Sequence, residues 1–332
     1  MSADFRALGV AVGHATDIEG ATGVTVVRGI DAPLRGGATV FGRAAGTREL
    51  NTLAVDHLVD RIDAVMLTGG SAYGLDAAAG VMRWMEERGR GFAVPGGVVP
   101  IVPAAVIFDL APLGRFDARP TVAMAYDACD VARPNEIAEG SIGAGTGATV
   151  GKIAGPSRAM KGGIGCSLES NGAWHVGAIA VVNALGDVRD AAGGIIAGAR
   201  SDDGPSASRR FIDTTRQLAT VGPPDSRLGG RFGAPLPTNT TLGVVATDAP
   251  LGRAELTQLA RAAAAALFRR ITPTGTSLDG DVVFALAPAV PPVPLGHATM
   301  AIEALAIGAL EGAIERAVRT ARGRDGVPGL AD

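Results

Sequence analysis

An irregular part of the chain gives way to an apolar one at Thr238-Asn239-Thr240-Thr241-Leu242-Gly243-Val244-Val245-Ala246-Thr247-Asp248. The run Leu242 to Ala246 predicts a buried strand, although so short a run also fits a helix. In one interpretation, the Asn and Thr side chains bond the local backbone before a strand. In the other, the chain cleaves itself between Asn239 and Thr240. Thr240 would then carry both a hydroxyl and a free α-amine, a pairing that activates a weak nucleophile.

The composition is that of a well-buried globular protein. Of 332 residues, 47% are hydrophobic and 19% charged, and the 48 glycines predict many tight turns. The formal net charge of −3 gives no reason to expect a nucleic acid or an anionic membrane as partner. So low a charged fraction favours a homo-oligomer, in which part of the surface is hidden.

Several features favour a cytoplasmic protein. The two cysteines, Cys129 and Cys166, are too few for a disulfide scaffold and indicate a reducing compartment. The segment Met1 to Arg6 lacks the basic and apolar regions of a signal peptide. No apolar run reaches the roughly 18 residues of a membrane span, so no membrane contact is expected.

Short apolar runs and turn residues predict an α+β protein with a single domain, 1–332. Strands are expected over Gly23–Arg28, Gly37–Val40, Val65–Thr68, Ala104–Leu110, Val176–Asn183, Leu242–Ala246 and Asp281–Leu286, the first two as antiparallel strands joined by turns. Helices are expected over Ser71–Arg88, with Leu75, Ala78, Ala79, Met82 and Met85 on one face, over Ala254–Arg270, with Leu256, Leu259, Ala263 and Leu267 on one face, and over His297–Arg319. The polar stretch 200–237, rich in Gly and Pro, is expected to be an exposed linker. Strands grouped together with helices on either side favour a layered sandwich over βαβ alternation.

The Gly-rich run 140–152 does not form a nucleotide-binding motif. A phosphate-binding loop needs Gly where Thr146 stands and Ser or Thr where Ile153 follows Lys152. A dinucleotide fingerprint needs a preceding strand, and none is clear here. Two interpretations remain: a tight turn in which backbones pack closely, or a turn that presents Lys152.

Metal and thiol sites are not expected. The histidines, His14, His57, His175 and His297, are scattered without metal-ligand spacing, so no metal or other cofactor is predicted. Cys166 is expected to be a small buried apolar residue. The pair in Asp279-Gly280-Asp281 by itself fits a turn in which Asp caps its own backbone.

Seven stretches, taken in order, resemble a family of self-processing N-terminal-nucleophile amidohydrolases. That family contains the L-aminopeptidase/D-esterases, the β-peptidyl aminopeptidases and the nylon-oligomer endohydrolase. The stretches are Gly46-Thr47-Arg48-Glu49, Leu67-Thr68-Gly69-Gly70-Ser71-Ala72-Tyr73-Gly74-Leu75-Asp76-Ala77, Ala105-Val106-Ile107-Phe108-Asp109-Leu110, Gly143-Ala144-Gly145-Thr146-Gly147-Ala148-Thr149-Val150-Gly151-Lys152, Lys161-Gly162-Gly163-Ile164-Gly165, Asn239-Thr240-Thr241 with Ala246-Thr247-Asp248, and Leu278-Asp279-Gly280-Asp281 with Phe284-Ala285.

The resemblance implies a four-layer αββα sandwich that cuts itself between Asn239 and Thr240, which gives fragments 1–239 and 240–332. Thr240 then corresponds to the nucleophile. The other positions that correspond to active-site residues are Lys152, Asn183 and the acidic pair Asp279 and Asp281, which would orient the new terminus.

The resemblance also implies the kind of substrate and assembly. Small peptides or amino-acid amides or esters are the expected substrates, and a tetramer of cleaved pairs is the expected homo-oligomer. Phe108 and Tyr73 are candidates for the substrate pocket. Some relatives have Tyr where this chain has Phe108, so an oxyanion contact must come here from Asn183 or from backbone N–H groups.

Two alternatives to a hydrolase stay open. An acyltransferase similar to the ornithine acetyltransferases would use the same sandwich and self-cleavage but pass the acyl group to an amino acid. A protein of the same fold without catalytic turnover would show neither reaction.

Overall fold

Two five-stranded sheets stack face to face in the computed structural model, which describes residues 3–201, 211–220 and 239–332. In spatial order the first sheet contains β1 (Val10–Asp17), β2 (Thr22–Gly29), β5 (Ala64–Thr68), β8 (Ala104–Val106) and β4 (Thr47–Arg48). The second contains β11 (Gly163–Ser170), β12 (His175–Asn183), β15 (Thr240–Thr247), β17 (Val282–Pro288) and β3 (Leu34–Val40).

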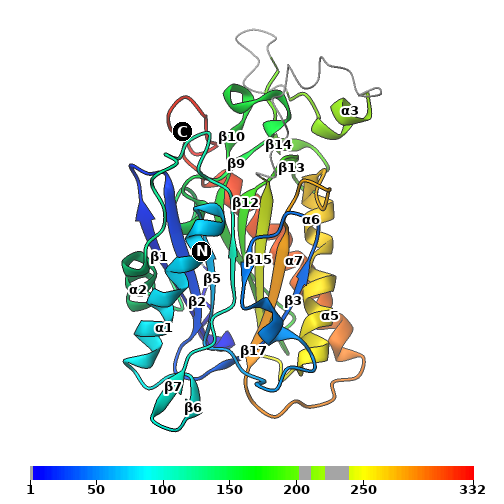
Figure 1. Cartoon of the computed structure of the whole chain (residues 1–332). Coiled ribbons are helices and arrows are strands. Elements are labelled where there is room, and N and C mark those ends of the chain that lie inside the picture. The colour runs from blue at the N-terminus through cyan, green and yellow to red at the C-terminus, as the bar shows by residue number, and fades with distance from the viewer. Residues whose placement is uncertain (1–2, 202–210, 221–238) are drawn as a thin grey trace.

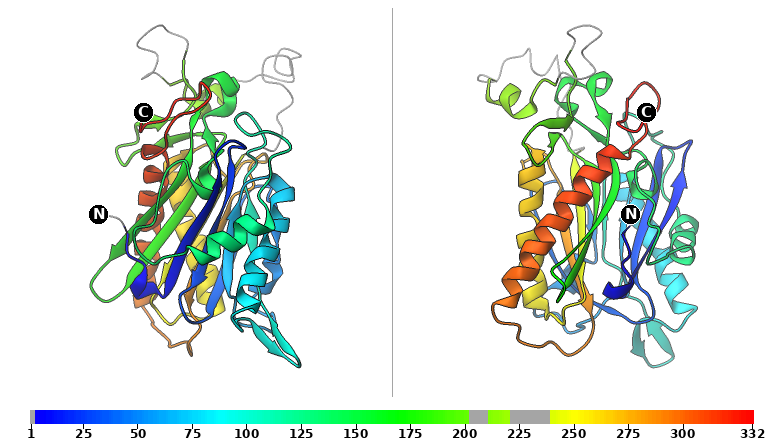
Figure 2. Two further views of the ribbon diagram at one scale, coloured as in Figure 1. Left: turned by 90° about the vertical axis from the view of Figure 1, so that its left-hand side faces the viewer. Right: turned by 180° about the vertical axis from the view of Figure 1, so that it is seen from behind.

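Helices cover both outer faces. Figure 1 shows four layers from left to right: α1 (Ala78–Glu86) and α2 (Val122–Asp130), the first sheet, the second sheet, and α5 (Arg253–Ala263), α6 (Ala265–Arg270) and α7 (Ala298–Arg319). Figure 2, from behind, shows α7 crossing the outer face of the second sheet. The expected four-layer αββα sandwich is therefore confirmed.

Smaller elements lie at the two ends of the sandwich (Figure 1). At one end are β9 (Thr149–Val150), β10 (Met160–Lys161), β13 (Asp187–Arg189), β14 (Ile195–Ala197), β16 (Ile271–Thr272) and α3 (Thr214–Ala219). The hairpin of β6 (Phe92–Val94) and β7 (Gly97–Val99) projects from the other end.

Side chains alternate between the two faces of each strand, which places three apolar layers in the protein. In β15, Leu242 and Val244 pack between the sheets, whereas Val245 packs against the outer helices. The same alternation separates Val181 from Val182 in β12. Strands buried on both faces account for the nearly continuous apolar runs in the sequence.

Phe284 lies at the centre of the layer between the sheets and has no exposed surface. We expect Phe284→Ala to lower the free energy of unfolding by about 3–5 kcal/mol, because it removes contacts and leaves a cavity. Chemical denaturation measures the change. Phe116→Ala, at a ring that is 61% exposed, should change it by less than about 0.5 kcal/mol. Equal losses in the two variants would contradict this assignment of the core.

Several predicted elements differ in the structure. The predicted helix Ser71–Arg88 begins as a 3₁₀-helix over Ser71–Ala77. Because a 3₁₀-helix has 3.0 residues per turn, the buried face shifts to Val81 and Trp84, and Ala79 is exposed. The predicted strand from Ala104 ends at Val106.

Three further predictions were wrong in part. Ala254–Arg270 is divided into α5 and α6, although its predicted apolar face is buried. The stretch 200–237 contains the helix α3, and its residues 202–210 and 221–237 lie outside the described part of the chain. Strand β3 does not pair with β2 but crosses to the second sheet, where it pairs with β17.

No helix within residues 3–201, 211–220 and 239–332 combines the length and apolar character needed to cross a membrane.

Candidate active site

Thr240 and Asn183 lie opposite each other at the adjacent ends of β15 and β12. In a strand, residues two positions apart point to the same face. Thr240 therefore shares the face of Leu242, and Asn183 shares the face of Val181, and both of these faces pack between the sheets. They are 5% and 1% exposed. The end of a buried strand pair thus places a hydroxyl and an amide within a largely dehydrated layer.

Two donors converge on the carbonyl oxygen of Asn239, the residue before Thr240. The Thr240 hydroxyl donates to it at 2.6 Å, and the backbone N–H of Gly280 donates to it at 3.0 Å. The parallel pairing of β15 with β17, which continues as a bridge between Asn239 and Asp279, brings these segments together. The carbonyl of the bond predicted to be cut is therefore polarised by a backbone donor and contacted by the predicted nucleophile.

Lys152 and a backbone amide hold the Asn183 side chain in one orientation. The Lys152 Nζ donates to Asn183 Oδ1 at 2.9 Å and to its backbone oxygen at 3.0 Å. The Thr149 N–H also donates to Oδ1, at 3.1 Å. The Asn183 Nδ2 donates to the carbonyl of Phe108 at 3.1 Å, so Phe108 enters the site through its backbone.

The acidic pair lies beside Thr240 but binds neighbouring groups while the Asn239–Thr240 bond is intact. Asp281 Oδ1 accepts from the N–H of Thr241, and Oδ2 accepts from the Thr274 hydroxyl, both at 2.6 Å. Asp279 Oδ2 accepts from the Thr276 N–H at 2.8 Å. The expected hydrogen bonds of this pair to Thr240 itself are not formed in this state of the chain.

Burial shifts the titration of these groups toward neutral pH. Burial lowers the pKa of Lys152 to about 7, although the charge of Asp279 partly opposes the shift. Burial, followed by the charge of Asp279, raises the pKa of Asp281 to about 6. The pKa of Asp279 is also raised by burial. At neutral pH the Lys152 amine is therefore populated in both its charged and its neutral form.

The Gly-rich run is a tight turn that also presents Lys152, so both interpretations of it apply. Gly151 has φ +67, and a Cβ there would lie 2.0 Å from the N atom of Ala199. A Cβ on Gly147 would lie 2.1 Å from the carbonyl oxygen of Ala21. Only glycine allows these approaches, which bring Thr149 and Lys152 against Asn183.

Tyr73 is in contact with another aromatic group. Its ring makes an edge contact with Phe116 at 6.3 Å, and the Arg119 guanidinium stacks on it at 3.5 Å. Tyr73 is 49% exposed. A role in the substrate pocket stays a prediction.

Sequence reasoning missed Gly280 and Thr149 because both act through backbone N–H groups. Any residue except proline carries such a donor, so residue type does not reveal it. The sequence shows only a glycine between two aspartates at Gly280. The close contact that requires this glycine, a Cβ position 2.6 Å from the carbonyl oxygen of Ala44, exists only in the folded chain.

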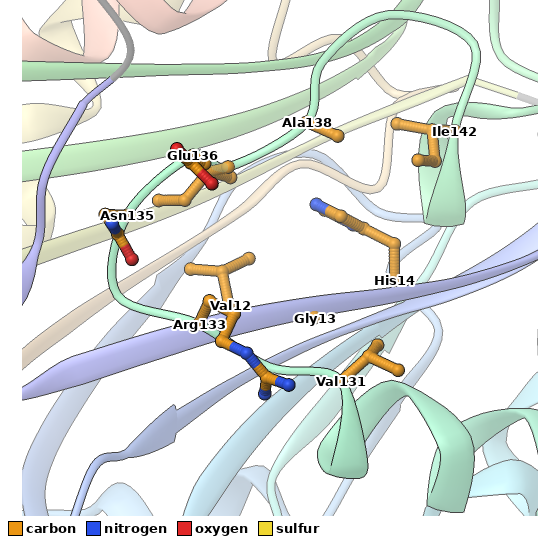
Figure 3. A pocket seen from close by; sticks show the side chains of 10 residues that line it. Val12, Gly13, His14, Val131, Arg133, Asn135, Glu136, Ala138 and Ile142 are labelled. Carbon is orange, nitrogen blue, oxygen red and sulfur yellow. The ribbon is translucent and has the colours of Figure 1, made fainter.

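A cavity of about 220 Å³ lies between β1 and the loop 131–142, away from these residues. Figure 3 shows the His14 ring directed toward the segment that carries Glu136 and Ala138. His14 Nδ1 lies 2.9 Å from the Thr25 hydroxyl, and burial lowers the pKa of His14 to about 4, so the ring is neutral at pH 7. None of the predicted site residues lines this cavity.

Cys166 lies in the core, as expected. Cys166 is 3% exposed, and burial raises its pKa to about 12, so its thiol stays protonated. His175 pairs instead with Asp248, with 2.7 Å between Nδ1 and Oδ2. The prediction that Cys166 is a small buried residue is confirmed.

Known proteins resemble this chain in sequence and in fold. The sequence pattern of peptidase family S58 matches residues 7–330. An uncharacterized aminopeptidase of Mycobacterium leprae is 43% identical over 279 residues, which cover 80% of this chain and 71% of that protein. A 6-aminohexanoate-oligomer endohydrolase of Kocuria is 31% identical over 318 residues, 91% of this chain and 80% of that protein.

A solved structure shows the same fold. The L-aminopeptidase D-Ala-esterase/amidase of Ochrobactrum anthropi, described as a variant of the Ntn hydrolase fold, superimposes with a TM-score of 0.70. The match covers 98% of this chain and 90% of that one at 21% identity. The resemblance inferred from the ordered motifs is confirmed by these findings.

Proposed function

The chain belongs to peptidase family S58, and we propose that it is a self-processing amidohydrolase whose nucleophile is Thr240. The observation that carries this proposal is the convergence of the Thr240 hydroxyl and the Gly280 N–H on the carbonyl oxygen of Asn239. Family membership supports hydrolysis of amide bonds. The identity of the nucleophile and the cleavage of the chain are our proposal.

In the processing step, the Thr240 oxygen adds to the carbonyl carbon of Asn239. The negative charge that develops on the Asn239 oxygen is stabilised by the Gly280 N–H. The base that took the hydroxyl proton passes it to the amide nitrogen as the C–N bond breaks, which leaves an ester between the Asn239 carbonyl and the Thr240 oxygen and frees the Thr240 amine. Water hydrolyses the ester, which gives the carboxylate of Asn239 and a free Thr240 hydroxyl.

Before cleavage there is no free α-amine at Thr240, so a different base must take the hydroxyl proton. We assign this role to neutral Lys152, which binds Asn183, the residue paired with Thr240 across the strands. Its pKa of about 7 provides the neutral form at physiological pH.

In the cleaved enzyme the α-amine of Thr240 takes over as base, because such amines titrate near ~7.7–8.0. The hydroxyl attacks the carbonyl of an amide or ester, and the C–N or C–O bond breaks as the α-ammonium gives its proton to the departing amine or alcohol. Water then hydrolyses the acyl-enzyme. The Asn183 amide donates to the oxyanion, an interaction worth roughly 3–4 kcal/mol in comparable sites. Asp279 and Asp281 bind the new amine and orient it.

The substrates that we propose are small peptides and amino-acid amides or esters. The support is the name of the Kocuria relative, which acts on 6-aminohexanoate oligomers, and the peptidase family itself. We also propose a single domain, a cytoplasmic location and a homo-oligomer of cleaved pairs.

The test begins with the intact mass of the purified protein under denaturing conditions, with N-terminal sequencing of the smaller fragment. Fragments 1–239 and 240–332 are expected, together with hydrolysis of amino-acid p-nitroanilides or 6-aminohexanoate oligomers. Acyl transfer to ornithine or glutamate without hydrolysis would favour the acyltransferase alternative. An uncut chain without turnover would overturn the proposal.

The pH dependence of processing should identify Lys152 as the base. Because burial lowers its pKa to about 7, the neutral form grows as pH rises, and the cleavage rate should rise through about pH 7 and then level off. Lys152→Arg stays charged and should slow cleavage by about 10²–10⁴-fold. Cleavage of freshly synthesised precursor is followed on gels between about pH 5 and 9. A flat profile, or normal cleavage in Lys152→Arg, would exclude this role.

A further inference from the structure

Lys161 is a fully buried lysine that the processing and hydrolysis steps do not use. It has 0% exposed surface, and its ammonium lies among backbone carbonyls. Its Nζ, which carries at most three hydrogens, lies within hydrogen-bonding distance of four carbonyl oxygens, those of Gly145 at 3.4 Å, Thr146 at 3.0 Å, Ala148 at 2.7 Å and Gly162 at 3.2 Å. Three of these carbonyls belong to the Gly-rich turn that carries Thr149 and Lys152.

A single peptide group, Ala148–Thr149, connects Lys161 to the active-site residue Asn183. The carbonyl of Ala148 and the N–H of Thr149 belong to the same planar unit and, in a trans peptide, point in opposite directions. On one side Lys161 binds the Ala148 oxygen at 2.7 Å. On the other side the Thr149 N–H binds Asn183 Oδ1 at 3.1 Å. Rotation of this peptide would break both hydrogen bonds together.

Neighbouring groups leave the turn little freedom to move as a whole. The Gly162 N–H also donates to the Ala148 oxygen, at 2.9 Å. On the opposite side, a Cβ added to Gly147 would lie 2.1 Å from the oxygen of Ala21 and 2.7 Å from the Cβ of Asp109. The Ala148 oxygen is therefore shared by two donors, the Gly162 N–H and the Lys161 Nζ, and only the Lys161 Nζ belongs to a side chain.

We propose that Lys161 is a positioning residue of the active site, which orients the Ala148–Thr149 peptide so that its N–H fixes the side-chain amide of Asn183. Since Asn183 Oδ1 receives this N–H and the Lys152 ammonium, its Nδ2 is set on the opposite side, where it meets the carbonyl of Phe108. This inference rests on the proposed function, in which Asn183 serves as an oxyanion donor.

The test is a double-mutant cycle between Lys161 and Asn183. Lys161→Met keeps the length of the side chain without its donors, and Lys161→Gln restores part of the donor capacity. We expect Lys161→Met to slow hydrolysis of a small amide substrate about 100-fold, the loss typical of one oxyanion donor. Lys161→Gln should retain an intermediate rate. In processed enzyme, kcat should fall while KM for a small amide substrate stays unchanged.

In an Asn183→Ala background, Lys161→Met should cause almost no further loss, because Lys161 acts through Asn183. Additive effects in the cycle would overturn the proposal. The matched control is Glu139→Gln, which removes a charge that binds the Cys166 N–H and Arg316 away from the site. If Lys161→Met and Lys161→Gln lose activity only in proportion to lost stability, as Glu139→Gln does, the positioning role is refuted.

The same experiment separates this inference from the proposed function. An uncut parent chain without hydrolysis means that the proposed function fails. If the parent protein is active but the rate losses of Lys161→Met and Asn183→Ala are additive, only the positioning role of Lys161 is refuted. If Lys161→Met does not fold, Lys161→Gln replaces it in the cycle. No further loss in the Asn183→Ala background then supports the positioning role, and additive losses refute it.

Discussion

Replacing Thr240 by valine is expected to leave one polypeptide of 33.2 kDa where the parent chain gives fragments 1–239 and 240–332. Valine keeps the shape of threonine but has no hydroxyl, and it is the Thr240 hydroxyl that contacts the Asn239 carbonyl at 2.6 Å. Removing a nucleophile costs about 10⁴–10⁶-fold in comparable enzymes, so hydrolysis of amide substrates should also disappear. Denaturing gels and intact mass measure the first effect, and a chromogenic amide assay measures the second.

The neighbouring threonine supplies a matched control. The Thr241 hydroxyl is buried and has no hydrogen-bond partner among the described residues, whereas its backbone N–H binds Asp281. Thr241→Val keeps that N–H and replaces an unsatisfied hydroxyl, so it should cleave and hydrolyse normally. Thr240→Ser should retain cleavage because it keeps a hydroxyl. Cleavage in Thr240→Val, or equal loss in the two valine variants, would rule out Thr240 as the nucleophile.

The second large effect is expected for Gly280→Ala. A Cβ at this position would lie 2.6 Å from the Ala44 carbonyl oxygen and 2.7 Å from its carbon, so the segment must move. That movement would displace the N–H that lies 3.0 Å from the Asn239 oxygen. Losing one preorganised oxyanion donor slows such reactions by about 10²–10³-fold, and we expect cleavage to slow by that factor.

The control for Gly280→Ala is Gly97→Ala. Gly97 lies in the projecting β6–β7 hairpin, and a Cβ there would meet nothing within 4 Å. Cleavage should proceed at the parent rate in this variant, and pulse-labelled precursor followed on gels gives both rates. If Gly280→Ala is cleaved as fast as Gly97→Ala, the Gly280 N–H does not stabilise the oxyanion.

Asp279 and Asp281 illustrate how far a motif predicts a site. The sequence places the two carboxylates just before β17, and the structure brings this segment beside the beginning of β15. Their hydrogen bonds, however, go to Thr276, Thr241 and Thr274 while the chain is intact. The motif therefore indicated which segment lies near Thr240, but not which atoms form hydrogen bonds, because that depends on the folded geometry of the loop before β17.

The sequence by itself determined the α+β class and most of the principal strands and helices, and its resemblance to a family indicated the candidate site residues. These follow from local periodicity and from ordered motifs, which each segment carries by itself. The tertiary structure decided which segments meet. Parallel pairing sets Leu242 of β15 beside Val282 of β17, so the residues before the two strands, Asn239 and Asp279, also lie together.

The backbone donors could only be found in the folded chain. The N–H groups of Gly280 and Thr149 look like those of any other residue in a sequence, because a peptide group has no side-chain signature. Their function depends on direction, and direction is fixed by long-range packing: β17 against β15 for Gly280, and the ammonium of Lys161 against the Ala148–Thr149 peptide for Thr149. The identity of the side chains in this protein is thus known from the sequence, whereas the direction of the backbone N–H groups around them is set by the fold.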